Sequence, residues 1–170
     1  SLLSHQVKQL GFAPTVWGTP FFYPQSKFGE EAYQSGYVVT TRSGEPYQVK
    51  WWQGKGFLLD VTNPHALDWF GDKLSGFQDS MGLAGYKFDA GEADYVPQDA
   101  VFYRELTSKN DYSHLYVKWI GENFSFCEVR TGWNNQTSPI FFRLWDLWSV
   151  WGYDNGLRSI IPSVLSMSMS

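Results

Sequence analysis

Gly85-Tyr-Lys-Phe-Asp-Ala-Gly-Glu92 is the stretch of sequence that decides the fold. It is a short apolar strand pattern that ends in a carboxylate, and Phe141-Phe-Arg-Leu-Trp-Asp146 has the same form further along the chain. Two such strands in one open-ended barrel would bring Asp89 and Asp146 to the same mouth. Two carboxylates at one mouth are the minimal equipment for hydrolysing a glycosidic bond.

Helical and strand patterns alternate along most of the chain. The clearest helix is predicted for residues 64–80, because Thr62-Asn-Pro64 is a helix start and Leu67, Phe70, Leu74 and Phe77 form one apolar stripe. Further helices are expected near residues 2–10 and 155–170. Strands are expected at 12–17, 57–61, 83–89, 125–130 and 140–146. Strands that alternate with helices indicate parallel βα units.

Two regions have less regular patterns. Residues 21–50 lack a sustained period and are predicted to form an ordered excursion with a hairpin, residues 37–41 against 47–51, around Ser43-Gly44. After Asp89 we expect a helical region that is broken at Lys109-Asn-Asp111 and ends near Gly121.

Acidic and basic side chains follow several of the predicted strands, which is typical of the C-terminal mouth of a (β/α)8 barrel. Alternation along a strand places Lys87 and Asp89 on the same face of their strand, and Glu128 and Arg130 on the same face of theirs. An ammonium group beside Asp89 would lower the pKa of that carboxyl and keep it ionised.

The composition excludes some partners. The net charge of −4 and the scattered Lys and Arg residues argue against nucleic acid, and no apolar run reaches the ~18 residues of a membrane span. Aromatic residues make up 19% of the chain. They fit either a bulky core or platforms on which sugar rings stack, and composition leaves both readings open.

Nothing in the sequence indicates a metal ion or another cofactor. His5, His65 and His114 are isolated and are predicted to be surface or helix histidines, and Cys127 is interpreted as a small buried residue. There is no serine-nucleophile elbow, phosphate loop or dinucleotide fingerprint. We therefore expect no cofactor.

Five motifs together resemble glycoside hydrolase family 31, and the match covers nearly the whole chain. Two of them, Lys87-Phe-Asp-Ala-Gly-Glu92 and Ser149-Val-Trp-Gly-Tyr153, are typical of one animal branch of that family. The others are Trp51-Trp-Gln-Gly54, Leu59-Asp-Val-Thr-Asn-Pro64 and Glu128-Val-Arg-Thr-Gly132.

The resemblance implies a partial (β/α)8 TIM barrel of α/β class, with about strands three to six present. It implies one catalytic-barrel fragment over residues 1–170, truncated at both ends. Asp89, after strand four, would be the nucleophile, and Asp146, after strand six, the acid/base. The implied substrate-binding residues are Trp52, Lys87, Glu92, Arg130 and Trp145. Trp145 and Trp148 depart from the family pattern, which would reshape the aglycone side.

The implied activity is retaining hydrolysis of terminal α-linked O-glycosyl bonds, with α-galactosides preferred and α-glucosides or α-xylosides as alternatives. The substrate would be an α-linked glycoside or oligosaccharide. A second hypothesis is a catalytically silent sugar-binding or regulatory relative. Half a barrel exposes sheet edges and apolar helix faces, so we expect residues 1–170 alone to be inactive and poorly soluble.

Two sequons, Asn123-Phe-Ser125 and Asn135-Gln-Thr137, hint at the secretory pathway or the lumen of the endoplasmic reticulum. Membrane anchoring would then come from a segment preceding this chain. Whether the full-length form is a homo-oligomer stays open.

Overall fold

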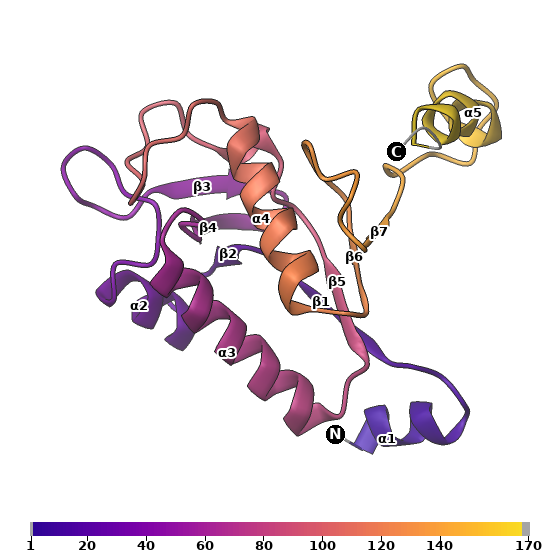
Figure 1. The fold of residues 1–170 in the computed structure, drawn as a ribbon, viewed down its shortest axis with the longest axis horizontal. Coiled ribbons are helices and arrows are strands. Elements are labelled where there is room, and N and C mark those ends of the chain that lie inside the picture. Colours follow the sequence, from indigo (N-terminus) through magenta and orange to yellow (C-terminus); the bar gives the residue numbers. More distant parts are fainter. Residues whose placement is uncertain (1, 168–170) are drawn as a thin grey trace.

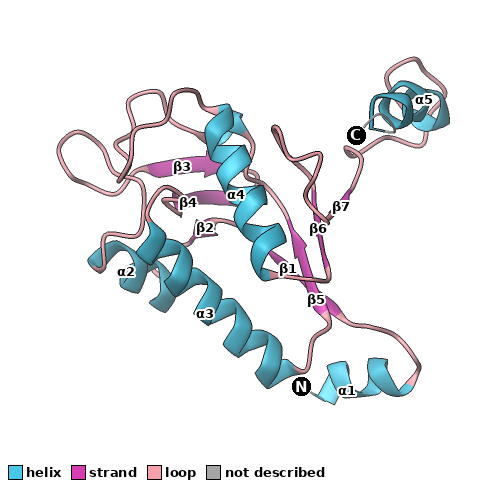
Figure 2. Ribbon diagram, viewed as in Figure 1, coloured by secondary structure: helices cyan, strands magenta, loops and turns pink. Residues whose placement is uncertain are grey.

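A four-stranded parallel sheet forms the centre of the fold (Figures 1 and 2). The computed structural model describes residues 2–167. The strands lie in the order β1-β5-β6-β7, and each runs parallel to its neighbour. They are β1 (Thr15–Gly18), β5 (Gly85–Phe88), β6 (Cys127–Val129) and β7 (Phe141–Phe142). The predicted parallel βα arrangement is confirmed, and so is the partial barrel class.

Two helices cover one face of this sheet. In α3 (Pro64–Met81), the side chain of Asn63 caps the first turn by accepting from the His65 amide, and the helix ends at Gly82, whose φ is +60°. The second helix, α4 (Asn110–Asn123), packs beside α3, and Trp119 stacks on Phe70. Phe88 of β5 contacts the ring of Tyr116 on α4, and the Tyr86 hydroxyl donates to the carbonyl of Leu74 on α3, so the core lies directly behind the carboxyl end of β5.

A second, antiparallel sheet departs from the prediction for residues 21–50. It consists of β2 (Phe21–Phe22), β3 (Gln48–Trp51) and β4 (Gly54–Leu58) in the order β2-β4-β3. The predicted hairpin of residues 37–41 with 47–51 is confirmed only next to its turn, where the Thr41 amide donates to Glu45 and the Tyr47 amide to Val39. Beyond this point the prediction is wrong, because residues 48–51 form β3 and pair with β4 instead. The helix α2 (Lys27–Gln34), capped by the Ser26 side chain, was not predicted.

The segment between β5 and α4 also differs from the prediction. Apart from a short 3₁₀ turn, η1 (Ala93–Tyr95), it is irregular up to residue 109, so the expected helical region begins only at Asn110. Buried Asp60 fixes this loop, since its carboxylate accepts a hydrogen bond from the Tyr103 amide. Because the loop backbone bonds to side chains, it does not need a helix to satisfy its polar groups.

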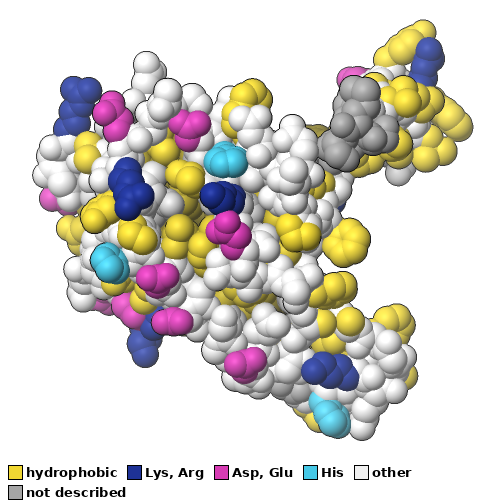
Figure 3. Space-filling model, viewed as in Figure 1, with side chains coloured by type: hydrophobic (Ala, Val, Ile, Leu, Met, Phe, Trp, Pro, Cys, Tyr) yellow, Lys and Arg dark blue, Asp and Glu magenta, His cyan; other side chains and the backbone are white. Residues whose placement is uncertain are grey.

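The chain after β6 is less compact. Residues 130–140 form no helix, and the strand predicted at 140–146 is limited to β7. The expected last helix is present as α5 (Gly156–Met167), which stands apart from the sheet in Figure 1. Figure 3 shows apolar side chains on it, and Trp151 just before it is 93% exposed. The expected first helix is α1 (Leu2–Gln9). No helix among residues 2–167 is long and apolar enough to cross a membrane.

Gly85 permits the close pairing of β5 with β6. A Cβ atom added at Gly85 would overlap the carbonyl oxygen of Phe126, which accepts the Tyr86 amide. We expect Gly85→Ala to destabilise the full-length protein by about 3 kcal/mol or more, because backbone must move. The measurement is the urea midpoint. Gly76→Ala in α3 is the control, since its Cβ meets nothing within 4 Å. Equal stability of the two variants would contradict this packing.

Candidate active site

Asp89 follows β5 directly and is only 6% exposed. Its Oδ2 accepts a hydrogen bond from the indole nitrogen of Trp17, at 2.8 Å. Its Oδ1 lies 3.1 Å from Nη2 of Arg143 and 3.2 Å from Nε of Arg130. The carboxylate is therefore held from three directions by side chains that come from three different strands or strand ends.

A tight turn follows this carboxylate. Ala90 and Gly91 both adopt positive φ, +60° and +91°. Such a conformation costs a non-glycine residue about 1–2 kcal/mol. At Gly91 an added Cβ would come within 2.5 Å of the Tyr116 ring. The turn sends the chain back across the site, and Glu92 Oε1 then lies 2.6 Å from Nε of Arg130.

These contacts lower the pKa of Asp89. Burial alone works in the opposite direction, since it penalises the charged form. The hydrogen bond from Trp17, the charge of Arg130, the backbone amide of Ala90 and the charge of Arg143 together outweigh burial. Asp89 is consequently held as a carboxylate.

Lys87 does not act on Asp89 as the sequence suggested. Strand pairing places Lys87 opposite Trp17 on β1 and opposite Glu128 on β6. Its ammonium group pairs with Glu128, at 3.8 Å, and the cations that lower the pKa of Asp89 are Arg130 and Arg143. The expectation that Lys87 keeps Asp89 ionised is therefore wrong, because Glu128 lies opposite Lys87 on the neighbouring strand.

Arg130 lies between two indole rings. Its guanidinium carbon is 4.6 Å from the ring centroid of Trp52 and 4.9 Å from that of Trp145. Trp51 is buried, whereas Trp52, directly after β3, is 46% exposed. Four of the predicted substrate-binding residues thus lie together beside Asp89. They are Trp52, Glu92, Arg130 and Trp145.

Asp146 reaches the same cluster through Arg143. Its Oδ1 lies 2.9 Å from Nη1 of Arg143, while its side chain remains 77% exposed. One guanidinium thus contacts both carboxylates that the sequence singled out. The sequence analysis missed Arg143 and Trp17 as site residues. Both lie inside predicted strands, and an Arg or Trp at the end of an apolar strand is the signal that could have indicated them.

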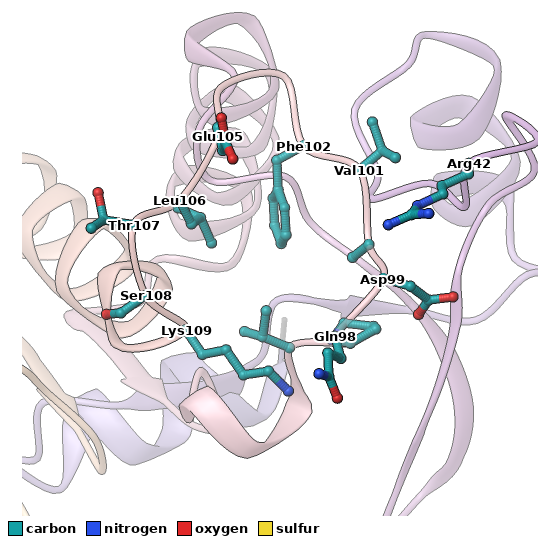
Figure 4. Close-up of a pocket in the computed structure, with 13 residues that line it drawn as sticks. Arg42, Gln98, Asp99, Val101, Phe102, Glu105, Leu106, Thr107, Ser108 and Lys109 are labelled. Atoms are coloured by element: carbon teal, nitrogen blue, oxygen red, sulfur yellow. The ribbon is translucent and has the colours of Figure 1, made fainter.

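The remaining polar residues are less suggestive. Residues 2–167 contain no group of three His, Cys, Asp or Glu side chains placed to hold a metal ion. Cys127 is buried, as predicted, and burial raises the pKa of its thiol to about 11. A separate cavity of about 490 Å³ lies between Arg42 and the loop of residues 96–109 (Figure 4). None of the predicted site residues lines it.

The geometry above coincides with a family match. The family model "Glycosyl hydrolases family 31 TIM-barrel domain" matches residues 2–170. The chain belongs to glycosyl hydrolase family 31. Over 165 residues, 96% of this chain, it is 41% identical to the myogenesis-regulating glycosidase of Mus musculus, of which it covers 23%. The family resemblance seen in the motifs is confirmed.

More distant family members match over the same span. Identity to the sulfoquinovosidase of Escherichia coli is 27%, covering 97% of this chain and 26% of that protein. The structure of a family 31 sulfoquinovosidase from E. rectale superposes with a TM-score of 0.81 over 98% of this chain and 27% of that one, at 24% identity. The chain thus spans about a quarter of the length of these relatives.

Proposed function

We propose that the full-length protein is a retaining α-glycosidase, with Asp89 as the nucleophile and Asp146 as the acid/base. The observation that carries this proposal is the state of Asp89. It is a buried carboxylate at the C-terminal end of a parallel strand, its pKa is lowered, and it shares Arg143 with a second carboxylate. The match of residues 2–170 to a TIM-barrel domain of glycosyl hydrolases supports the proposal.

The proposed reaction has two steps. Asp89 attacks the anomeric carbon while Asp146, protonated, gives its proton to the leaving oxygen. Water then cleaves the glycosyl-enzyme, with Asp146 as the base. Retention needs the two carboxyl groups about 5–5.5 Å apart. The guanidinium of Arg143 touches both groups, which supports their action on one bond.

The surrounding residues have proposed roles in holding the sugar. Trp52 and Trp145 are partly exposed rings against Arg130, which contacts Asp89, and such rings suit the apolar face of a pyranose. Arg130 lies between these rings, and Glu92 orients its Nε. Lys87 on β5 and Glu128 on β6 form an ion pair that precedes Asp89 and Arg130 along the chain, and we assign this pair to binding a sugar hydroxyl.

For the sugar we propose an α-galactoside, with α-glucosides and α-xylosides as the alternatives. The names of the relatives do not point to a single sugar, since they include the α-xylosidase XylQ of Lactiplantibacillus pentosus, 29% identical over 69% of this chain, and two sulfoquinovosidases. The choice of sugar therefore has to come from a substrate panel.

The test uses the full-length protein from its complete reading frame. It is assayed on aryl α-galactoside, α-glucoside and α-xyloside beside the variant Asp89→Asn. Release from one substrate that is lost in the variant supports both the activity and the sugar. Silence of a folded protein on the whole panel and on natural α-linked oligosaccharides contradicts the proposal and favours a sugar-binding relative.

We also propose that the protein passes through the secretory pathway. In that case the structure separates the two sequons. Asn123 is exposed at the end of α4, where its Nδ2 donates only to the Trp119 carbonyl of its own helix. Asn135 is buried and both its amide atoms are bonded, Nδ2 to the His114 carbonyl and Oδ1 to the Trp133 amide.

We expect a glycan on Asn123 and none on Asn135 when the full-length protein is secreted from animal cells. A glycan on Asn135 would have to occupy a closed, hydrogen-bonded position. Peptide mass spectrometry after deglycosylation in heavy-oxygen water checks both sites, and Asn123→Gln is the control. Occupancy of Asn135 in folded protein would contradict this expectation.

A further inference from the structure

Arg143 contacts both proposed catalytic carboxylates through different nitrogen atoms. Nη2 is 3.1 Å from Asp89 Oδ1, and Nη1 is 2.9 Å from Asp146 Oδ1. Its Nε is buried without a hydrogen-bond partner and lies 3.8 Å from Glu128 Oε1. Every acidic side chain that faces this guanidinium therefore belongs to the site, and Glu128 is itself paired with Lys87.

The backbone fixes this position. Arg143 follows β7, and its amide donates to the carbonyl of Val129 at 2.9 Å, which extends the pairing of β6 with β7 by one residue. The side chain then crosses β6 towards the end of β5, and it is only 20% exposed. A planar guanidinium held in this way presents separate nitrogen atoms to the two carboxylates, whereas the ammonium of a lysine has to bond both from a single nitrogen and does so less well.

We infer that Arg143 is a positioning residue that acts as the shared counterion of Asp89 and Asp146 through both steps of the reaction. This inference rests on the proposed function. In the first step a bond forms between Asp89 and the anomeric carbon. The bond to the leaving oxygen breaks with its electron pair, and that oxygen takes the proton of Asp146.

The negative charge therefore moves from Asp89 to Asp146 during this step. Before it, Asp89 is the anion and Asp146 is protonated; after it, Asp89 is an ester and Asp146 is the anion. Arg143 contacts both Asp89 and Asp146, so its positive charge faces an anion in each state without a change of position. A charged group that need not reorganise during the reaction is the arrangement that stabilises a transition state best. Within residues 2–167, Arg130 forms ion pairs with Asp89 and Glu92 and none with Asp146.

Trp17 provides the comparison that separates this role from a simple effect on Asp89. Its indole donates to Asp89 Oδ2 and not to Asp146. Trp17→Phe should therefore disturb only the first step. Arg143→Met should disturb both steps, and Arg143→Lys should restore part of each. Arg42→Met, a change of the same kind outside the site, is the control.

The experiment measures the full-length enzyme on its best aryl α-glycoside. In the pH profile of kcat/KM, the fall in activity on the acidic side (the acidic limb) reports the ionisation of Asp89. The pKa of Asp89 is lowered, so activity falls as the pH drops through it; removing Arg143 raises that pKa, and the fall begins at higher pH. We expect an upward shift of roughly one unit in Arg143→Met. With an activated leaving group, burst kinetics give the second step, which should slow by about tenfold or more.

Two results overturn the inference. One is an Arg143→Met enzyme whose acidic limb is unchanged. The other is a normal second step together with a shifted limb, which would make Arg143 a partner of Asp89 alone. Wild-type silence on all α-glycosides would instead count against the proposed function. In that case the thermal stability of double variants tests whether Arg143 contacts both Asp89 and Asp146. Arg143→Met should lower the melting temperature less in an Asp89→Asn background, and also less in an Asp146→Asn background, than in the wild type. Full additivity in either background overturns the shared contact.

Discussion

Asp89→Asn is expected to abolish turnover by the full-length enzyme, with a loss of about 10⁴-fold or more in kcat on every substrate that the wild type cleaves. The amide cannot form the glycosyl ester, while it keeps the size of the carboxyl and can still accept from Trp17. The fold should survive, because the sheet and helix contacts of β5 do not depend on this charge. Initial rates and thermal melting of both proteins check this.

The matched control is Asp94→Asn, in the 3₁₀ turn just beyond the site. Asp94 is exposed and has no part in the cluster, so its loss should leave kcat within twofold of the wild type. A second control is chemical rescue: azide should restore release of an activated aryl group from Asp89→Ala by taking the place of the missing nucleophile. Activity of Asp89→Asn within a few-fold of the wild type would contradict its assignment.

Asp146→Ala is expected to have the second-largest effect, and one that depends on the leaving group. Glycosides with alkyl leaving groups need a proton from the acid, so their kcat/KM should fall by about 10²–10⁴-fold. Aryl glycosides with good leaving groups do not need it, and their first step should be nearly unchanged. The exposed position of Asp146 beside Trp145 suits contact with the aglycone.

The measurement is kcat/KM over a series of aryl glycosides whose leaving groups differ in acidity, compared between wild type and Asp146→Ala. The dependence on leaving-group acidity should be steeper in the variant. Asp154→Ala, further along the same exposed segment, should leave the series unchanged. An equal loss on all substrates would count against an acid/base role for Asp146.

Local patterns predicted the parts of the fold that are set by local physics. The helix α3 begins where its cap and its proline indicate and spans its apolar stripe, and β5 lies within the predicted strand at 83–89. By contrast, β2 and β7 consist of two residues each, and β2 pairs with β4, which lies beyond α2 and β3 in the chain. Sequence periods do not specify such pairings.

The candidate site shows the same division. Strand ends predicted that Asp89 and Arg130 lie at the same mouth of the barrel, and their side chains lie 3.2 Å apart. The partners of Lys87 and Arg143 were not predictable, because they depend on strand register. Lys87 meets Glu128 only because β5 and β6 pair at that position, and Arg143 reaches Asp89 across β6 from a residue 54 positions away.

The most direct measurement is to trap the glycosyl-enzyme. The full-length protein is incubated with an activated fluoroglycoside whose covalent intermediate breaks down slowly, and its peptides are then analysed by mass spectrometry. The account predicts one added fluoroglycosyl group, located on Asp89, and no label in Asp89→Asn. A label on another residue, or turnover of the probe with no covalent adduct and inverted product, would contradict it.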